Sequence, residues 1–549
     1  MLAPNYDHEI PEMTVEVARA AFPKGNVVMK IRDELGPLFE DREFAGLYPK
    51  MGQPSVSPAC LALVTILQFM ENLTDREAAD AVRSRIDWKY LLALELTDAG
   101  FHYSVLSEFR QRLLEHGEEE MLLNRILEQC VAAGLLKGQS KQRTDSTRVL
   151  AKIRSLNRVE LAGETMRRVL DDIARIAPIW LQAHIKEDWG ARYGTPVDTH
   201  DIRKSKAKLE KLAQTIGEDG HCLLAAIYQQ DTPTKIRSLS TVEVLRQVWV
   251  QQYYLEGGRS YWRKKGDQGF PPSGKMIASP DDLDARYSAK YGVGWTGYKL
   301  HVTETCDPEE PRLITQVTTT VATVPDSNMT EAIQEDLISL DLSPETHWVD
   351  AGYVNTDNLL SSQGKGIDLL GPARGDSSWQ ARTEGGYDQT QFIIDWENMV
   401  ATCPEGQQSM FWKAGKSSWG RPNIHFLFSR PLCFQCSARE KCSRGKKNGR
   451  HLTVSPRPAF EMLKQARERE QTEAFKEEYK RRAGVEGTIA QAVNALGARH
   501  NRYRGLARTH LQHVATASAI NLRRIAAWLM GDRPGVTRVS PFAALAASL

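Results

Sequence analysis

The stretch KGQSKQRTDSTRVLAKIR, residues 137–154, places one carboxylate, Asp145, among six lysine and arginine side chains. From Asp145 onward every second residue is apolar or threonine, namely Thr147, Val149, Ala151 and Ile153. This alternation predicts a β-strand in which Asp145 shares a face with residues destined for burial. Two interpretations fit such an acid: a surface salt bridge, or a metal site that acts on a polyanion.

The composition describes a globular protein of several domains. At 549 residues the chain is too long for one ordinary core, and it is 41% hydrophobic and 26% charged. No apolar run approaches the ~20 residues of a membrane span, and the N-terminus has no pattern of a secretory signal. We therefore expect a cytoplasmic protein whose eight cysteines are thiols or metal ligands rather than disulfides. The net charge of only +2 excludes a histone-like polyanion binder.

The region before Asp145 is predicted to be helical, from about residue 57 to 125. SPACLALVTILQFM begins with Ser57 as the cap and Pro58 at the first helical position, and Thr74 and Glu77 have the spacing of a capping box. A third helix is expected near HYSVLSEFRQRLL, residues 102–114, with its arginines, Arg110 and Arg112, exposed. Short helices of this kind suit a DNA-binding helix-turn-helix, and they suit a small helical bundle equally well.

Residues 155–275 are predicted to be a mainly helical insertion. It ends in VWVQQYYLEGGRSYWRKK, residues 248–265, where aromatic and cationic side chains alternate. Such a segment could clamp a nucleic-acid strand by stacking, or it could be an aromatic core beside a solvated basic loop.

Strand signals resume at GYKLHVTET, residues 297–305, and at RLITQVTTTV, residues 312–321. ETHWVDAGYVNTDNLLSSQGKGIDLLGPAR, residues 345–374, then predicts a strand, a short helix and a parallel strand, with Asp350 at the end of the first strand. Sites in open α/β sheets are built at these carboxyl ends of strands.

A long helix is expected from about residue 460 to 497. In EEYKRRAGVEGTIAQAVNAL, residues 477–496, one helical face holds Tyr479, Arg482, Glu486, Ile489 and Val493. Because the later turns of this face are apolar, Glu486 is expected to point inward, where a carboxylate needs a metal or a cation. The simpler alternative is an Arg482–Glu486 ion pair within the helix.

Four cysteines lie in a loop-rich region before that helix. CFQCSAREKC contains Cys433, Cys436 and Cys442, and Cys403 lies upstream. Four thiols suit a tetrahedral structural zinc site, with His451 as a reserve ligand, although a redox pair is an alternative. The basic segment KCSRGKKNGR, residues 441–450, would then be presented to DNA.

These pieces, taken in order, resemble the DDE transposases of bacterial insertion sequences. RTDST at 143–147, HWVDAGY at 347–353 and YKRRAGVEG at 479–487 carry the resemblance, together with GYKLHVTET and RYRGLARTHLQHVATASAINLRRI at 502–525. The resemblance extends from about residue 40 to 530. One departure is Val493, because related motifs often place a lysine or arginine seven residues after the glutamate.

The resemblance implies an α/β fold with a ribonuclease H-like mixed sheet. Asp145, Asp350 and Glu486 would be the catalytic acids and would hold two Mg²⁺ or Mn²⁺ ions, with Asp145 bridging both. It implies a protein that binds the inverted-repeat ends of its element, cleaves them and joins the 3′ ends to target double-stranded DNA, as a homodimer on DNA. The expected phosphate contacts are Tyr479, Arg482, Arg499, Arg502, Arg504, Arg143 and Arg148. The alternatives are a ribonuclease H-like nuclease without strand transfer, and a DNA-binding regulator with a zinc module.

The expected organisation follows from these assignments. A helical N-terminal domain at 1–130, which could bind DNA through a helix-turn-helix, precedes the first strands of the core at 138–154. The helical insertion at 155–275, the continuing core at 276–374, the Cys-rich insertion at 375–455, the C-terminal core helices at 456–530 and a tail at 531–549 complete the chain.

Overall fold

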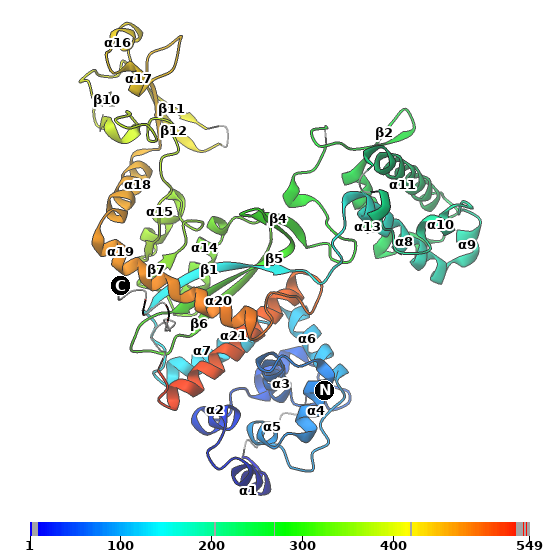
Figure 1. The fold of residues 1–549 in the computed structure, drawn as a ribbon. Helices are drawn as coiled ribbons and strands as arrows, with labels where there is room; N and C mark the ends of the chain where they lie inside the picture. Colours follow the sequence, from blue (N-terminus) through cyan, green and yellow to red (C-terminus); the bar gives the residue numbers. More distant parts are fainter. Residues whose placement is uncertain are drawn as a thin grey trace.

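The computed structural model describes residues 1–2, 9–202, 205–267, 269–417 and 420–533, together with Phe542 and Leu545. A central sheet is flanked by the N-terminal helices, and two further modules extend from it in different directions (Figure 1). The expected tail at 531–549 lies almost wholly outside the described residues. Within the described part of the chain, no helix is long and apolar enough to cross a membrane.

The central sheet has the strand order β4-β5-β1-β7-β8, with β6 also paired to β5. β1 (Lys141–Leu150) is antiparallel to β5 (Val293–Thr305) and parallel to β7 (Thr346–Val349). β6 (Ile314–Val321) and β4 (Arg286–Lys290) are antiparallel to β5, and β8 (Asp368–Leu370) is parallel to β7. Antiparallel strands on one side of β1 and parallel strands on the other confirm the predicted mixed-sheet, ribonuclease H-like core.

Helices cover both faces of this sheet. Side chains on β6 alternate between the faces: Gln316 donates to Asp336 of α14 (Thr330–Ser339), whereas Thr319 contacts His513 of α21 (Leu506–Leu529). The predicted strand–helix–strand unit is formed by β7, α15 (Thr356–Gly364) and β8.

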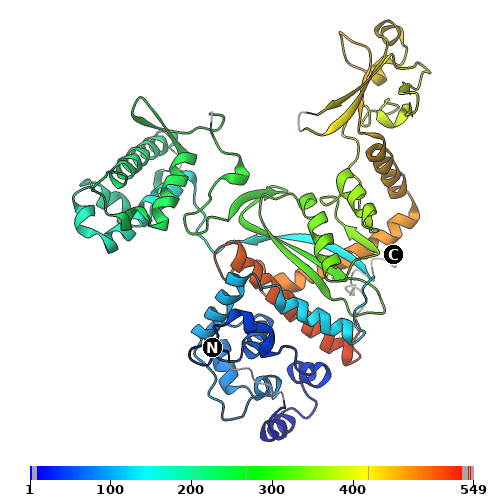
Figure 2. The same cartoon turned by 180° about the vertical axis from the view of Figure 1, so that it is seen from behind.

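Apart from the first of them, which packs in a small separate cluster with Met29 and Tyr90, the N-terminal helices share one hydrophobic core with the sheet. They are α1 (Glu12–Ala21), α2 (Val27–Leu35), α3 (Pro58–Met70), α4 (Asp75–Ser84), α5 (Ile86–Leu91), α6 (Ser104–His116) and α7 (Met121–Ala132), and α7 lies beside α21 (Figures 1 and 2). The Ser57 cap and the Thr74–Glu77 capping box are both present. The expectation that Arg110 is exposed is wrong, because its guanidinium is buried and pairs with Asp75 at 2.6 Å.

The helical insertion has a hydrophobic core of its own. Its helices are α8 (Arg158–Ile176), α9 (Pro178–Gln182), α10 (Trp189–Tyr193), α11 (Lys206–Ile227), α12 (Thr234–Arg237) and α13 (Ser240–Gln252), followed by the hairpin of β2 (Tyr253–Glu256) and β3 (Arg259–Trp262). Trp249 and Tyr253 are buried in this core, which confirms the core interpretation for these two aromatics. They pack directly on α11 at Gly220 and Gly217, where an added Cβ would overlap the rings.

The Cys-rich module forms a third, small core. β11 (Phe411–Lys416), β12 (Pro422–Leu427) and β13 (His451–Val454) form its larger sheet, and β9 (Ile393–Asp395) pairs with β10 (Val400–Thr402). The short helix α16 (Arg430–Gln435) contains Cys433 and is followed directly by Cys436, and the short helix α17 (Arg439–Cys442) ends with Cys442.

The prediction of one continuous helix from about residue 460 to 497 is wrong. The chain forms α18 (Arg457–Glu470), α19 (Glu473–Tyr479), the 3₁₀ turn η6 (Lys480–Ala483) and α20 (Gly484–Asn494). The first break occurs because the Thr472 side chain accepts a hydrogen bond from the Phe475 N–H and caps a new helix. Glu486 is therefore on a separate short helix, next to the sheet.

Candidate active site

Strand register brings the two aspartates together. Thr144 of β1 is the partner of Val349 of β7 in a parallel ladder, so Asp145 and Asp350 follow at the same level on neighbouring strands. The Asp145 side chain is only 13% exposed. Its burial raises the pKa of Asp145, and the charge of Asp350 raises it further, whereas Arg482 and the Ser146 N–H lower it.

Arg482 lies between the acids. Its guanidinium donates to Asp145 Oδ2 at 2.7 Å and to Glu486 Oε1 at 2.9 Å. Burial alone would lower the pKa of Arg482, but Asp145, Glu486 and Asp350 together raise it. Two of the three predicted acids, which are far apart in the chain, thus bond to one cation, and the charge of the third, Asp350, acts on it as well.

Glu486 does not face inward as expected. Its side chain is 64% exposed, and the inner face of α20 carries Val485, Thr488 and Ala492 instead. The reason is that α20 docks on the sheet through Thr488, whose hydroxyl bonds the buried Glu304, and through Gly484, which packs on Arg143, so the neighbouring face that carries Glu486 is left outward. Glu486 therefore lies at the rim of the site, where solvent and a ligand can reach it.

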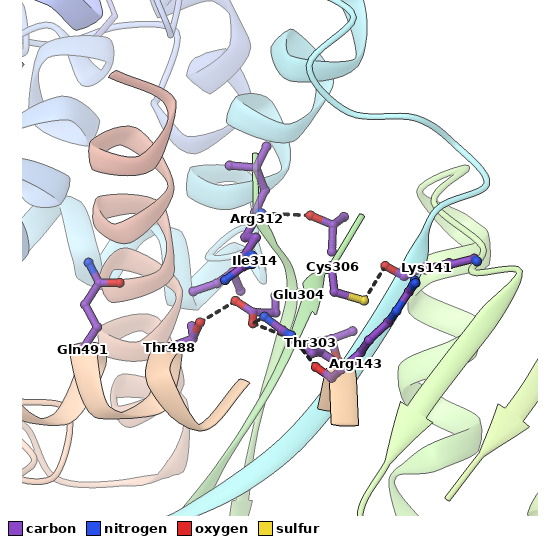
Figure 3. Close-up of polar contacts among 12 residues, drawn as sticks. Lys141, Arg143, Thr303, Glu304, Cys306, Arg312, Ile314, Thr488 and Gln491 are labelled. Atoms are coloured by element: carbon purple, nitrogen blue, oxygen red, sulfur yellow. Dashed lines mark hydrogen bonds and ion pairs between the residues drawn. The ribbon is translucent and has the colours of Figure 1, made fainter. Parts of the chain in front are cut away.

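A buried ion cluster around Glu304 fixes α20 against the sheet (Figure 3). Glu304 of β5 is fully buried and receives hydrogen bonds from Arg143 Nε at 2.8 Å and from Arg524 Nη1 of α21 at 2.8 Å. The Thr488 hydroxyl of α20 donates to Oε2 of the same carboxylate at 2.5 Å. This cluster joins β1, β5, α20 and α21, so it positions the helix that bears Glu486.

Sequence reasoning missed Glu304, although the sequence held a signal for it. Glu304 lies in the β-branched strand GYKLHVTET, directly opposite Arg143 in the β1–β5 ladder. Glu304 shares a strand face with Leu300 and Val302, and a carboxylate on such an apolar face indicates a buried partner. The first turn of α20 then packs on Arg143, and an added Cβ at Gly484 would overlap its guanidinium.

Tyr479 supports the end of β7. Its ring stacks on Phe475 with 5.4 Å between centroids, and its hydroxyl donates to the Val349 carbonyl at 3.1 Å. Burial raises the pKa of Tyr479 to about 12, so the hydroxyl stays protonated. Tyr479 thereby anchors α19 beside Asp350.

The donor set fits hard divalent cations, because carboxylate oxygens surround one positive charge without histidine or cysteine. As the side chains stand, no group of three or more His, Cys, Asp or Glu residues in the described chain is arranged to hold a metal ion. The guanidinium of Arg482 forms ion pairs with two of these carboxylates, Asp145 and Glu486, and so takes the place that a metal ion would occupy between them.

Comparison with known protein families matches residues 402–526 to a transposase DDE domain. Residues 16–112 match a transposase domain (DUF772). The two matches support a DDE transposase of the insertion-sequence type. The DDE match contains Glu486 and the four clustered cysteines, while Asp145 and Asp350 lie upstream of it. No curated protein matches this transposase.

The predicted DNA-contacting arginines of the transposase divide into two groups. Arg143 is 4% exposed and paired with Glu304, and Arg502 donates to Leu73 O and packs over the Phe69 ring at 4.5 Å. Both arginines have partners within the fold, and a contact of either one with phosphate stays a prediction. Arg148 and Arg504 are exposed.

Arg499 lies against Arg148. Its guanidinium donates to the Arg148 carbonyl at 2.8 Å. Burial lowers the pKa of Arg499, and the neighbouring charge of Arg148 lowers it further. Two cations that repel each other at the end of β1 would be stabilised by an anion between them.

The four cysteines of the module line one cavity of about 40 Å³. Two sulfur atoms accept backbone N–H groups: Cys403 from Gln407 at 3.3 Å and Cys433 from Arg450 at 3.4 Å. Burial raises the pKa of Cys442 to about 11; Arg450 lowers it and the other three thiols raise it, as expected for neighbouring groups. His451, the reserve ligand, does not line this cavity, and its ring lies 4.9 Å from the His425 ring.

Proposed function

We propose that this transposase binds the inverted-repeat ends of its mobile element, cleaves them by metal-dependent hydrolysis and joins the 3′ ends to target DNA. The observation that carries the proposal is the meeting of Asp145, Asp350 and Glu486 around Arg482. A surface salt bridge, the first alternative for Asp145, does not account for two carboxylates bonded to one guanidinium and a third whose charge acts on it.

Asp145, Asp350 and Glu486 would hold two Mg²⁺ or Mn²⁺ ions. Such ions would supply activation of the attacking oxygen and stabilisation of the leaving oxygen in an in-line displacement at phosphorus. Asp145 is held by the strand register on both sides of β1, so its carboxylate needs little reorganisation. Glu486, at the exposed rim, is the carboxylate with room to move.

Arg482 has a second task in this proposal. Its guanidinium, which bonds Asp145 and Glu486 in this structure, would be free to hold a phosphate oxygen next to the cut once those carboxylates serve as metal ligands. Arg148, Arg499 and Arg504 would hold the DNA backbone farther along, and binding should weaken steeply with salt. Because two ends have to be joined, the active form is at least a dimer on DNA.

The Cys-rich module would hold one structural zinc ion. Four thiols around one small cavity, with backbone N–H groups directed at two sulfurs, suit a tetrahedral Cys₄ site. The zinc would fix α16 and α17 against the small sheet. The basic segment at 441–450 would then be held in one conformation for DNA.

The test uses Asp145→Asn, Asp350→Asn and Glu486→Gln, each assayed for binding and cleavage of the element's end DNA. Each should bind the DNA and lose cleavage by roughly 10³-fold or more, because metal ligation contributes several kcal/mol to the barrier. Glu473→Gln, on the exposed surface of α19, is the matched control and should cleave normally. Cleavage that survives any of the three changes with DNA binding intact refutes the site. Cleavage without joining to a supercoiled target would identify a nuclease instead.

A further inference from the structure

The strand ladder that aligns the two aspartates ends just before them. β1 and β7 pair only as far as Thr144 and Val349, and Val349 is the last residue of β7. Within the described residues, no further ladder pair joins Asp145 of β1 to Asp350 in the loop beyond β7. The separation of the two carboxylates therefore depends on how that loop is held.

The loop turns back at Tyr353, whose backbone is held at both of its polar groups. Its N–H donates to the Asp350 carbonyl at 2.9 Å and closes a β-turn. Its carbonyl accepts from the Asn358 side-chain amide at 2.7 Å and from the Thr330 hydroxyl at 2.9 Å. The loop after Asp350 is thus fixed to α14 and α15, and the Tyr353 side chain is fully buried.

The Tyr353 ring spans β1, which lies between β7 and β5 in the sheet. Its hydroxyl is 2.6 Å from Nδ1 of His301 on β5, and the two rings meet edge to face with 5.8 Å between their centroids. His301 is the partner of Ser146 in the β1–β5 ladder, so this hydrogen bond lies next to the residue that follows Asp145. Because neighbouring residues of a strand point to opposite faces, Tyr353 supports β1 from the face opposite to the Asp145 carboxylate.

His301 is itself held on its other side, where Nε2 is 3.1 Å from the Thr320 hydroxyl of β6. Burial lowers the pKa of His301 to about 4, so the neutral ring offers one donor and one acceptor nitrogen to its two hydroxyl partners. Burial raises the pKa of Tyr353 well above its usual range, so its hydroxyl stays protonated. Tyr353, His301 and Thr320 thus form one buried chain of hydrogen bonds from the Asp350 loop to β5 and β6.

We propose that Tyr353 is a positioning residue, which sets the separation of the Asp145 and Asp350 carboxylates by tying the Asp350 loop to His301 across β1. This inference rests on the proposed function, because a fixed separation matters only if the two acids share metal ions. Hydrogen-bonded partners behind metal ligands commonly contribute about 10- to 100-fold to metal affinity or activity. Tyr353 acts through the loop and touches neither metal nor DNA.

The decisive variant is Tyr353→Phe, which removes only the hydroxyl. Binding of Mn²⁺ to the protein on end DNA that is already cut, followed by electron paramagnetic resonance, should weaken about 10- to 100-fold, and cleavage of intact end DNA should fall by a similar factor. Binding of the end DNA should be unchanged. Tyr193→Phe is the matched control, because Tyr193 is also buried and its hydroxyl donates to Asp219 at 2.9 Å in the separate core of the helical insertion. Its unfolding temperature should fall as that of Tyr353→Phe does, while Mn²⁺ binding and cleavage stay at wild-type levels.

Two variants of His301 test the same hydrogen bond from its other end, and they decide the matter if Tyr353→Phe does not fold. His301→Asn keeps an acceptor close to the position of Nδ1 and should retain most of the Mn²⁺ affinity, whereas His301→Leu should show the loss expected of Tyr353→Phe. The double variant Tyr353→Phe/His301→Leu should lose no more than either single variant, because both changes remove one bond. Wild-type Mn²⁺ affinity in folded Tyr353→Phe or His301→Leu would overturn the positioning role alone. Wild-type cleavage by Asp145→Asn would overturn the proposed function itself.

Discussion

Replacement of Glu304 by glutamine tests whether the buried cluster supports the site. Glutamine at this position would keep the shape of the side chain and remove its charge, leaving Arg143 and Arg524 without their shared carboxylate. The Arg143 side chain is 5% exposed and that of Arg524 20%, so water cannot replace the lost partner well. Breaking such a buried pair costs about 3–5 kcal/mol, a large share of the ~5–15 kcal/mol that stabilises a typical domain.

The assay is urea unfolding of the purified protein, followed by cleavage of end DNA under conditions where the variant is folded. We expect Glu304→Gln to lower the free energy of unfolding by about 3 kcal/mol or more. Cleavage should also fall, because the Thr488 hydroxyl that holds α20 loses a charged acceptor. Glu310→Gln is the control: this buried glutamate pairs with Lys137, whose side chain is 69% exposed, and the change should cost about 1 kcal/mol. A Glu304→Gln protein within about 0.5 kcal/mol of the wild type, the scatter of surface substitutions, would refute the reasoning.

Three other predictions follow from single contacts. Gly484→Ala should destabilise the fold and slow cleavage, because its Cβ would collide with Arg143, whereas Gly487→Ala has open space and should stabilise α20 by up to about 1 kcal/mol; urea unfolding of both measures this. Burial lowers the pKa of His301 and of His347 to about 4, below the unfolded value, so only the unfolded chain takes up protons as the pH falls toward 4. Stability should therefore be complete above about pH 6.5 and decline toward pH 4, by roughly 3 kcal/mol per histidine, in unfolding experiments across this range. Purified protein should contain one zinc per chain, which Cys436→Ser or a strong chelator removes; metal analysis that finds none, with all four thiols freely reactive, would contradict the zinc site.

The parts of the site that the sequence predicted are those set by short-range pattern. Asp145 and Asp350 each follow from the alternation or the end of a single strand, and the ladder then brings them together. The outward position of Glu486 could not be predicted, because the inner face of α20 is set by Thr488 and Gly484, which pack on the buried Glu304 and Arg143 of distant strands. The inward positions of Arg110, Arg143 and Arg502 were missed for a related reason. Their partners lie on other elements, and a one-dimensional pattern marks an arginine as exposed until its partner is known.

The charges on the two sides of α20 differ in a way that bears on function. In the buried cluster, Arg143 and Arg524 carry two positive charges against the one negative charge of Glu304. At the candidate site, Asp145, Asp350 and Glu486 carry three negative charges against the one positive charge of Arg482, which leaves two uncompensated. An excess of carboxylates over cations in a half-buried place is costly unless further cations bind there. The excess negative charge at the candidate site would therefore favour the binding of divalent cations. A phosphate group bound to those cations would contact Arg482, which already lies next to the carboxylates.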